Sequence, residues 1–220
     1  AFPTTIPDDG AEQLLEIGRD VFGDLIDQPG IWAFWWPRFE RVAGWFVAHE
    51  RGRRLVAQVV GSEVKGILDL AAPGGTFRLT AVADRIEKLG DGTLAIVDYK
   101  TGMPPKNQEV ESGFSPQLPV EAVIAQAGGF EDIDAAETRE FAIWQLSGGG
   151  AGGKVFKFGK LDLPETITKT RDGLEIFIAA FDELSMPYRS HPRPDNGPRF
   201  SDYDHLARVK EWSAGGGGDE

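Results

Sequence analysis

The stretch Ile96–Gly102 reads Ile-Val-Asp-Tyr-Lys-Thr-Gly and places two charged side chains at the end of an apolar run. Alternate side chains of a strand share a face, so we expect Asp98 and Lys100 on one face and Tyr99 on the other. A charged pair at the end of a core strand is unfavourable unless other groups satisfy it. The stretch therefore predicts a buried β-strand that ends in a polar site.

The preceding strand carries a second acid, within the run Ala83–Ile86 (Ala-Asp-Arg-Ile). The segment Gly90–Gly92 (Gly-Asp-Gly) between the two strands is a hairpin signal. A loop with an odd number of residues would set Asp84 directly opposite Asp98 and on the same face. We therefore expect two carboxylates to converge with the amine of Lys100.

This set of groups is suited to phosphodiester hydrolysis. Two close carboxylates repel each other, and a hard divalent cation relieves that repulsion while it organises water and phosphate oxygens. A neighbouring ammonium can position the attacking water or offset charge in the transition state. The alternative is a set of ordinary ion pairs at a sheet edge, in which Asp84 pairs with Arg85 and the second acid pairs with Lys100. The apolar flanks argue against that alternative.

The rest of the chain predicts an α/β fold. Apolar periodicity and turn signals predict helices at about 11–26, 37–55, 116–127 and 167–184. Strands are expected at about 56–70, 76–87, 93–101, 137–146 and 155–158, the first three as an antiparallel meander. Three parts are expected: an N-terminal helix and aromatic linker at 1–36, a core with its C-terminal helix at 37–186, and an irregular tail with a flexible end at 187–220.

Two features of the predicted helices leave alternatives open. The aromatic run Trp32–Trp36 could stack on nucleic-acid bases, but the absence of interleaved basic residues favours a hydrophobic hinge. Glu50 continues the apolar stripe of the helix at 37–55. It is either turned toward a polar site or neutralised by Arg53 and Arg54, which stand three and four residues later.

The composition of the chain excludes several classes of function. With 220 residues, 41% hydrophobic and 26% charged, the chain is globular rather than disordered. A net charge of −12 argues against a simple basic DNA-coating protein, but it is compatible with an enzyme whose carboxylates hold divalent metals. Zero cysteines exclude disulfides, thiolate zinc sites and cysteine nucleophiles. No run is apolar enough to span a membrane and no basic leader precedes an apolar stretch, so we expect a cytoplasmic protein without a membrane partner.

The two motifs resemble those of the PD-(D/E)XK nuclease superfamily, specifically its RecB-like branch. Ala83–Ile86 is similar to the second motif of that branch, and Asp98–Gly102 is similar to the third, often written DYKTG. Gln117 stands where the branch carries a Gln-x-x-x-Tyr motif, with Glu121 in place of the tyrosine. The resemblance implies a restriction-endonuclease-like core, with a mixed sheet that contains the antiparallel meander and is flanked by helices.

The resemblance also implies roles. Asp84, Asp98 and the backbone carbonyl of Tyr99 would bind Mg²⁺ or Mn²⁺, and Lys100 would be the water-positioning base. Relatives carry a histidine in a Gly-x-x-x-His context that is missing near 14–22. That histidine could lie upstream, or its role could fall to Glu50, with His49 a weaker substitute off the stripe. The implied catalytic set is Asp84, Asp98, Lys100, Gln117 and Glu50.

The segments 36–41, 115–119 and 203–208 are further similar to the C-terminal region of the AddB family of bacterial helicase–nuclease subunits. This similarity implies an exonuclease that acts on DNA in double-strand break repair and recombination, with a partner subunit of the AddA type. Neighbouring domains would then provide most of the contacts to the DNA backbone. Basic residues crowd the segment 189–210, which is more typical of a solvated tail than of a DNA-binding rim.

Two other functions stay open. One is a catalytically silent PD-(D/E)XK domain that acts as a structural or DNA-channelling module. The motif residues favour activity, whereas the missing histidine favours silence. The other is a calcium-binding, β-rich adhesion domain, which would explain the acidity of the chain but not a lysine directed to the same face as two acids.

Overall fold

The structure is a computed structural model in which residues 2–188 are described. The expected basic tail segment 189–210 lies outside the described residues, as does the segment 203–208. The chain divides into two compact units, residues 1–179 and 180–220. Within the described part of the second unit, the rings of Phe181 and Tyr188 stack with their centroids 5.0 Å apart.

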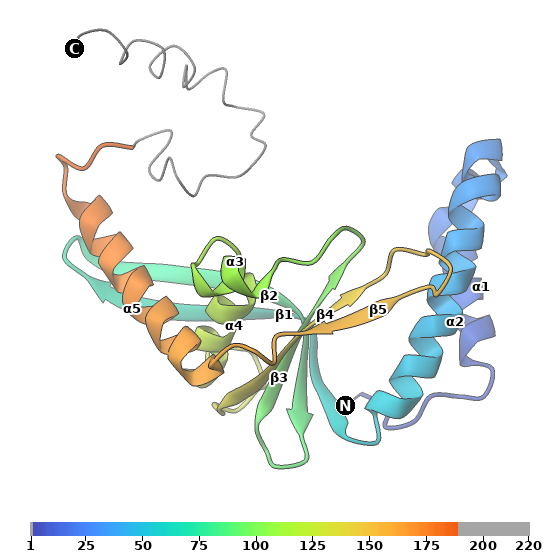
Figure 1. Ribbon diagram of the computed structural model, residues 1–220, viewed down its shortest axis with the longest axis horizontal. Helices are drawn as coiled ribbons and strands as arrows, with labels where there is room; N and C mark the ends of the chain where they lie inside the picture. The colour runs from blue at the N-terminus through green and yellow to red at the C-terminus, as the bar shows by residue number, and fades with distance from the viewer. Residues whose placement is uncertain (1, 189–220) are drawn as a thin grey trace, which may run out of the picture. The chain divides into compact units, whose positions relative to one another are not determined.

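One five-stranded sheet forms the centre of the first unit (Figure 1). Its strands lie in chain order: β1 Ala57–Ala72, β2 Gly75–Leu89, β3 Leu94–Lys100, β4 Thr138–Gln145 and β5 Lys154–Lys157. Neighbouring strands are antiparallel except for β3 and β4, which are parallel. The expected α/β class, with a mixed sheet and an antiparallel three-strand meander, is confirmed.

The helices are α1 Gly10–Phe22, α2 Trp36–Arg53, α3 Asn107–Glu111, α4 Gln117–Gln126 and α5 Leu163–Asp182. Parallel strands need a crossover connection, and the segment that carries α3 and α4 supplies it between β3 and β4. The sequence did not predict α3, because five residues are too few to show a helical period. A 3-10 helix, η1 Gly23–Asp27, and a π-helix, η2 Ile31–Trp35, connect α1 to α2.

The turn between β2 and β3 sets the register of the hairpin. The backbone N–H of Leu89 donates to the carbonyl of Thr93, which leaves a loop of Gly90–Gly92. Gly92 has a φ of +87°, a conformation that glycine adopts without strain. The loop is therefore odd, as expected, and beyond it Arg85 pairs with Val97.

The two faces of the sheet bury different sets of side chains. The face toward α4 is the main apolar core, in which residues of β2, β3, β4 and α4 pack together: Ile86, Ile96, Phe141, Ile143, Ala122 and Ile124. The opposite face is covered by α2, where Val97, Ala142 and Trp144 pack against Trp45 and Phe46. Strand alternation assigns each side chain of β3 to one of these faces.

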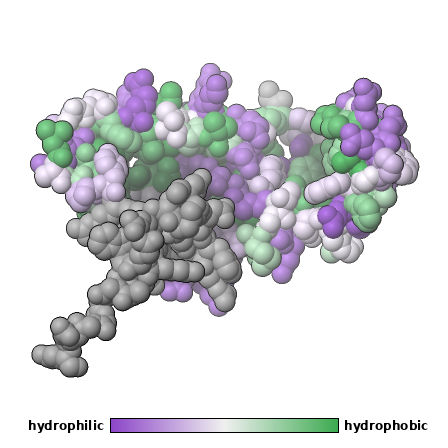
Figure 2. All heavy atoms as spheres, turned by 90° about the horizontal axis from the view of Figure 1, so that it is seen from above, coloured by the Kyte–Doolittle hydropathy of each residue, from purple (hydrophilic) through white to green (hydrophobic). Residues whose placement is uncertain are grey.

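The aromatic run before α2 is only partly a hinge. Trp36 is 2% exposed, and its ring packs against Phe22 and Phe39. In contrast, Trp32, Phe34 and Trp35 are each more than half exposed. Consecutive residues of a helix point in all directions around its axis, so five in a row cannot all face the interior. Apolar side chains show among polar ones at the corresponding, right-hand end of Figure 2.

Across the described residues, no helix combines the length and the apolar character that a membrane span requires.

Candidate active site

The candidate site lies where β2 and β3 separate. The ladder ends at the pair of Arg85 with Val97, and the same register continued by one residue sets Asp84 level with Asp98. Here the backbone N–H of Tyr99 donates to Oδ2 of Asp84 at 2.9 Å. A side chain thus replaces the backbone acceptor that would have continued the ladder. The arrangement agrees with the expectation that the two acids lie opposite each other.

Asp98 is buried, with 3% of its surface exposed; one side chain hydrogen-bonds to its Oδ1, and its Oδ2 has an ion-pair contact but no hydrogen bond within the described residues. The amide Nε2 of Gln117 donates to its Oδ1 at 2.6 Å, and the Nζ of Lys100 lies 2.9 Å from its Oδ2. Lys100 Nζ also donates to the Oε1 of Gln117 at 3.3 Å. The three side chains therefore form a closed set of contacts at the end of β3, as the sequence predicted for Asp98 and Lys100.

Helix α4 brings Gln117 to this set. The helix begins at Gln117, directly after Pro116, and its apolar side packs on the core face of the sheet. Its first residue therefore lies beside the end of β3, on the same face as Asp98. The sequence placed Gln117 at the opening of this helix, and the structure brings its side chain into hydrogen-bond contact with Asp98 and Lys100.

A further acid, Glu121, lies one helical turn after Gln117 and is 2% exposed. Burial raises the pKa of Glu121 to about 8, against the effect of a hydrogen bond with Gln117. The nearby charges of Asp98 and Asp84 also raise this pKa, so the carboxyl group of Glu121 lies within electrostatic reach of both aspartates. In the sequence, Glu121 is recognisable only as a departure from the tyrosine of the Gln-x-x-x-Tyr motif. Its spacing of four residues from Gln117 was the signal that the two side chains share a face.

The oxygen donors present here fit a hard divalent cation. Within residues 2–188, no group of three His, Cys, Asp or Glu side chains is arranged to hold a metal ion. Two carboxylates and a backbone carbonyl are a different donor set, and Mg²⁺ commonly binds through one or two carboxylates while it retains waters. The N–H of Tyr99 faces Asp84, and the carbonyl of the same residue faces the same edge of β3.

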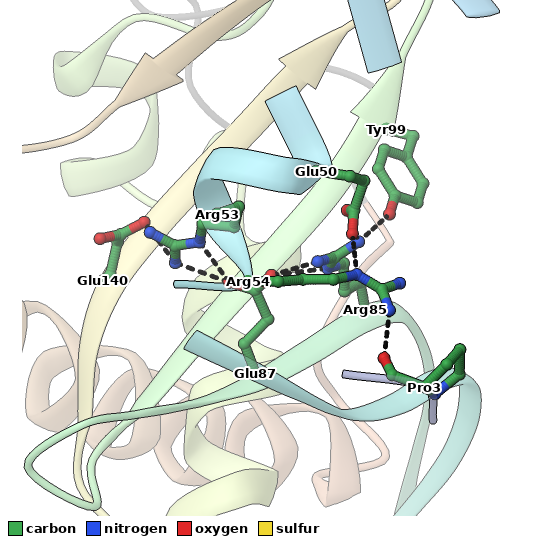
Figure 3. A network of polar contacts seen from close by, with 8 residues as sticks. All are labelled: Pro3, Glu50, Arg53, Arg54, Arg85, Glu87, Tyr99 and Glu140. Carbon is green, nitrogen blue, oxygen red and sulfur yellow. Dashed lines mark hydrogen bonds and ion pairs between the residues drawn. The ribbon is translucent and has the colours of Figure 1, made fainter. Parts of the chain in front are cut away.

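Glu50, expected among the catalytic residues, does not lie in this set. It is 1% exposed on α2, at the opposite face of the sheet, where it pairs with Arg54 at 2.7 Å and with Arg85 (Figure 3). Arg85 points to this face because strand alternation turns it away from Asp84. The expected neutralisation of Glu50 by Arg54 is thus present.

The same network extends along the α2 face (Figure 3). Arg53, expected to pair with Glu50, instead pairs with Glu87 at 2.6 Å and with Glu140 at 2.9 Å. The Nε of Arg85 donates to Oε1 of Glu87 at 2.7 Å. Glu87 is completely buried between two arginines, so this network is structural and fastens α2 to the sheet.

Tyr99 and His49 also contribute side chains to the α2 face. Arg85 donates to the Tyr99 hydroxyl at 3.3 Å, while the backbone of Tyr99 serves Asp84. The ring of His49 stacks on Trp45 and meets the ring of Trp144 edge-on. Burial lowers the pKa of His49, and the structure does not bring this residue to the aspartates.

Comparison with known proteins bears on this geometry. The family model described as the PD-(D/E)XK nuclease superfamily matches residues 5–192. An uncharacterized protein of Rickettsia bellii is 32% identical over 122 residues, and one of Rickettsia typhi is 31% identical over 117 residues. These matches cover 56% and 53% of this chain but only 15% and 14% of the relatives, so the chain is similar to a small part of much longer proteins. Because the family model spans most of the sequence, the chain belongs to the PD-(D/E)XK nuclease superfamily.

Proposed function

We propose that this chain is a metal-dependent DNA nuclease that hydrolyses phosphodiester bonds. One observation carries the proposal: Asp98 is buried, is held by Lys100 and Gln117, and stands level with Asp84. Membership of the superfamily supports the same reaction class. Ordinary surface ion pairs are a poor alternative, because such pairs are exposed and Asp98 is not.

Asp84, Asp98 and the carbonyl of Tyr99 would hold Mg²⁺ or Mn²⁺. When bound, such an ion would offset the charge of both carboxylates and activate water for attack on phosphorus. Lys100 is one-third exposed, so its amine can reach solvent and a docked phosphate. Its role is to position the water or to offset charge on the phosphate in the transition state. Gln117 orients both Asp98 and Lys100 through one amide group.

The more detailed proposal is an exonuclease of the RecB-like branch that belongs to an AddB-type subunit. It would work with an AddA-type partner in double-strand break repair and recombination. The motif order and the small share of the relatives' length that this chain covers support a nuclease domain within a larger machine. The net charge of −12 supports it too, because the other parts of that machine would then bind most of the DNA backbone.

Cleavage of linear and closed circular DNA by the purified chain, with Mg²⁺ or Mn²⁺, tests this proposal. The expected result is that linear DNA is degraded and that Asp98→Ala abolishes the degradation. Asp69→Ala is a matched control, because Asp69 is an exposed acid that pairs with Arg78 on the β1–β2 hairpin. Equal cleavage by the parent chain and Asp98→Ala would contradict the assigned site, and cleavage of circular DNA would contradict the exonuclease assignment.

A catalytically silent module is the second candidate, and one observation favours it. His49 is directed to the α2 face, and the other two histidines, His191 and His205, lie outside the described residues. The described site therefore contains no histidine. DNA binding by the chain without cleavage under any of these metal conditions would place this candidate first.

A further inference from the structure

Glu121 is the buried charged group of the core face that the proposed reaction does not use. Its Oε2 is shielded from solvent and has no hydrogen-bond partner within residues 2–188. Its side chain borders a pocket of about 290 Å³ between β2 and the start of α4, together with Ala81, Val82 and Gln117. A buried carboxyl group with a free oxygen is unfavourable unless a ligand or a solvent molecule completes it.

The contacts of Gln117 indicate what Glu121 does. An amide side chain has two N–H donors on one atom and a carbonyl acceptor on another. In this site one N–H faces Asp98 and the carbonyl faces Lys100, while Glu121 lies one helical turn after Gln117 and lines the same pocket. If the amide turned over, its carbonyl would face Asp98 and its NH₂ group would face the ammonium. A Glu121 carboxyl group that accepts a hydrogen bond from the second N–H of the amide would favour the orientation that the structure shows.

We propose that Glu121 is a positioning residue of the cation site: it holds the Gln117 amide toward Asp98, and its free oxygen takes up a water of the cation bound by the two aspartates. The inference rests on the proposed function, since it assumes that Asp84 and Asp98 bind a divalent cation. Glu121 does not need to reach the ion itself, which agrees with the lack of a three-side-chain metal cluster in residues 2–188.

This arrangement accounts for an acid where the resemblance to the RecB-like branch suggests a tyrosine. Both side chains can hydrogen-bond to Gln117, but only the carboxylate adds negative charge beside a bound cation. Mg²⁺ retains several of its waters, so a group that accepts hydrogen bonds from those waters stabilises the bound ion. Removal of such an outer partner typically lowers metal affinity 10- to 100-fold.

Calorimetric titration of the chain with Mn²⁺ at pH 8 tests the inference. We compare the parent chain with Glu121→Gln, Asp98→Ala and Glu131→Gln, where Glu131 is an exposed acid outside the site. The expected result is that Glu121→Gln lowers the Mn²⁺ affinity by at least 10-fold, while Glu131→Gln leaves it unchanged. Circular dichroism checks that each variant is folded. Glu121→Tyr is a second variant that also lacks the carboxylate, and it should show the same loss if Glu121→Gln does not fold.

The pH dependence of the Mn²⁺ affinity distinguishes this role from a role in packing alone. In the parent chain Mn²⁺ affinity should rise between pH 7 and pH 9, because Glu121 must lose its proton, and in Glu121→Gln that rise should be smaller. Unchanged affinity in folded Glu121→Gln and Glu121→Tyr, with loss of binding in Asp98→Ala, would overturn the role of Glu121 and leave the nuclease proposal standing. Unchanged binding in Asp98→Ala would instead overturn the cation site on which both proposals rest.

Discussion

The pKa of Glu121 makes the stability of the metal-free chain depend on pH. This pKa is about 8 in the folded chain, against 4.5 for an unperturbed glutamate. Between these values the folded chain holds a proton that the unfolded chain has released, so the free energy of unfolding falls as the pH rises. The limit is about 1.4 kcal/mol per pH unit, which is the free energy of one pKa unit. From pH 5.5 to 7.5 the expected loss is on the order of 2–3 kcal/mol.

Urea unfolding in the presence of a chelator measures this loss at pH 5.5, 6.5 and 7.5. Glutamine does not titrate, so Glu121→Gln should show a flatter dependence and should be more stable than the parent at pH 7.5. His49 acts in the opposite direction below its usual pKa of 6.5, because burial lowers that pKa. The difference between parent and variant cancels the effect of His49, and Glu131→Gln should match the parent. Parallel pH dependences in the parent and in Glu121→Gln would refute the reasoning.

Two further predictions concern cleavage and stability. Lys100→Ala should still bind Mn²⁺ in calorimetry, because both aspartates remain, but it should lose cleavage by orders of magnitude. Lys100→Arg should restore little cleavage, because guanidinium differs in shape and does not readily release a proton. Cleavage by Lys100→Ala at the parental rate would contradict this role. Glu87→Ala should lower the free energy of unfolding, measured by urea titration, by about 3–5 kcal/mol, because two buried arginines lose a partner. Asp69→Ala removes an exposed ion pair and should lower this free energy by less than about 1 kcal/mol. Equal losses in these two variants would show that the buried network is not structural.

The part of the site on β3 could be predicted from local rules. Alternation set Asp98 and Lys100 on one face, and the three-residue loop Gly90–Gly92 set the register that brings Asp84 level with Asp98. Both rules act over a few residues and do not depend on how distant elements pack. The helix that carries Gln117 was predictable for the same reason, from the proline before it and from the glycines after it.

The rest depended on packing that the sequence does not show. Glu50 and Glu121 are both buried acids on helices, and sequence spacing alone could not tell which face of the sheet each helix would cover. Arg85 of β2 decided the outcome for Glu50, since its side chain approaches this acid across the α2 face. The sequence shows Glu121 only as a replacement for tyrosine, because its burial results from the docking of α4 on the sheet.

Tyr99 makes contacts at both faces of the sheet. Its main chain holds Asp84 in the candidate site, while its ring is held from behind by Arg85, which in turn is held by Glu50 and Glu87. A random mutagenesis screen for lost DNA cleavage should therefore recover substitutions at Arg85 and Glu50, although neither side chain lies on the face of the two aspartates. A map of such hits drawn on the surface alone would miss them, since both side chains are buried between α2 and the sheet.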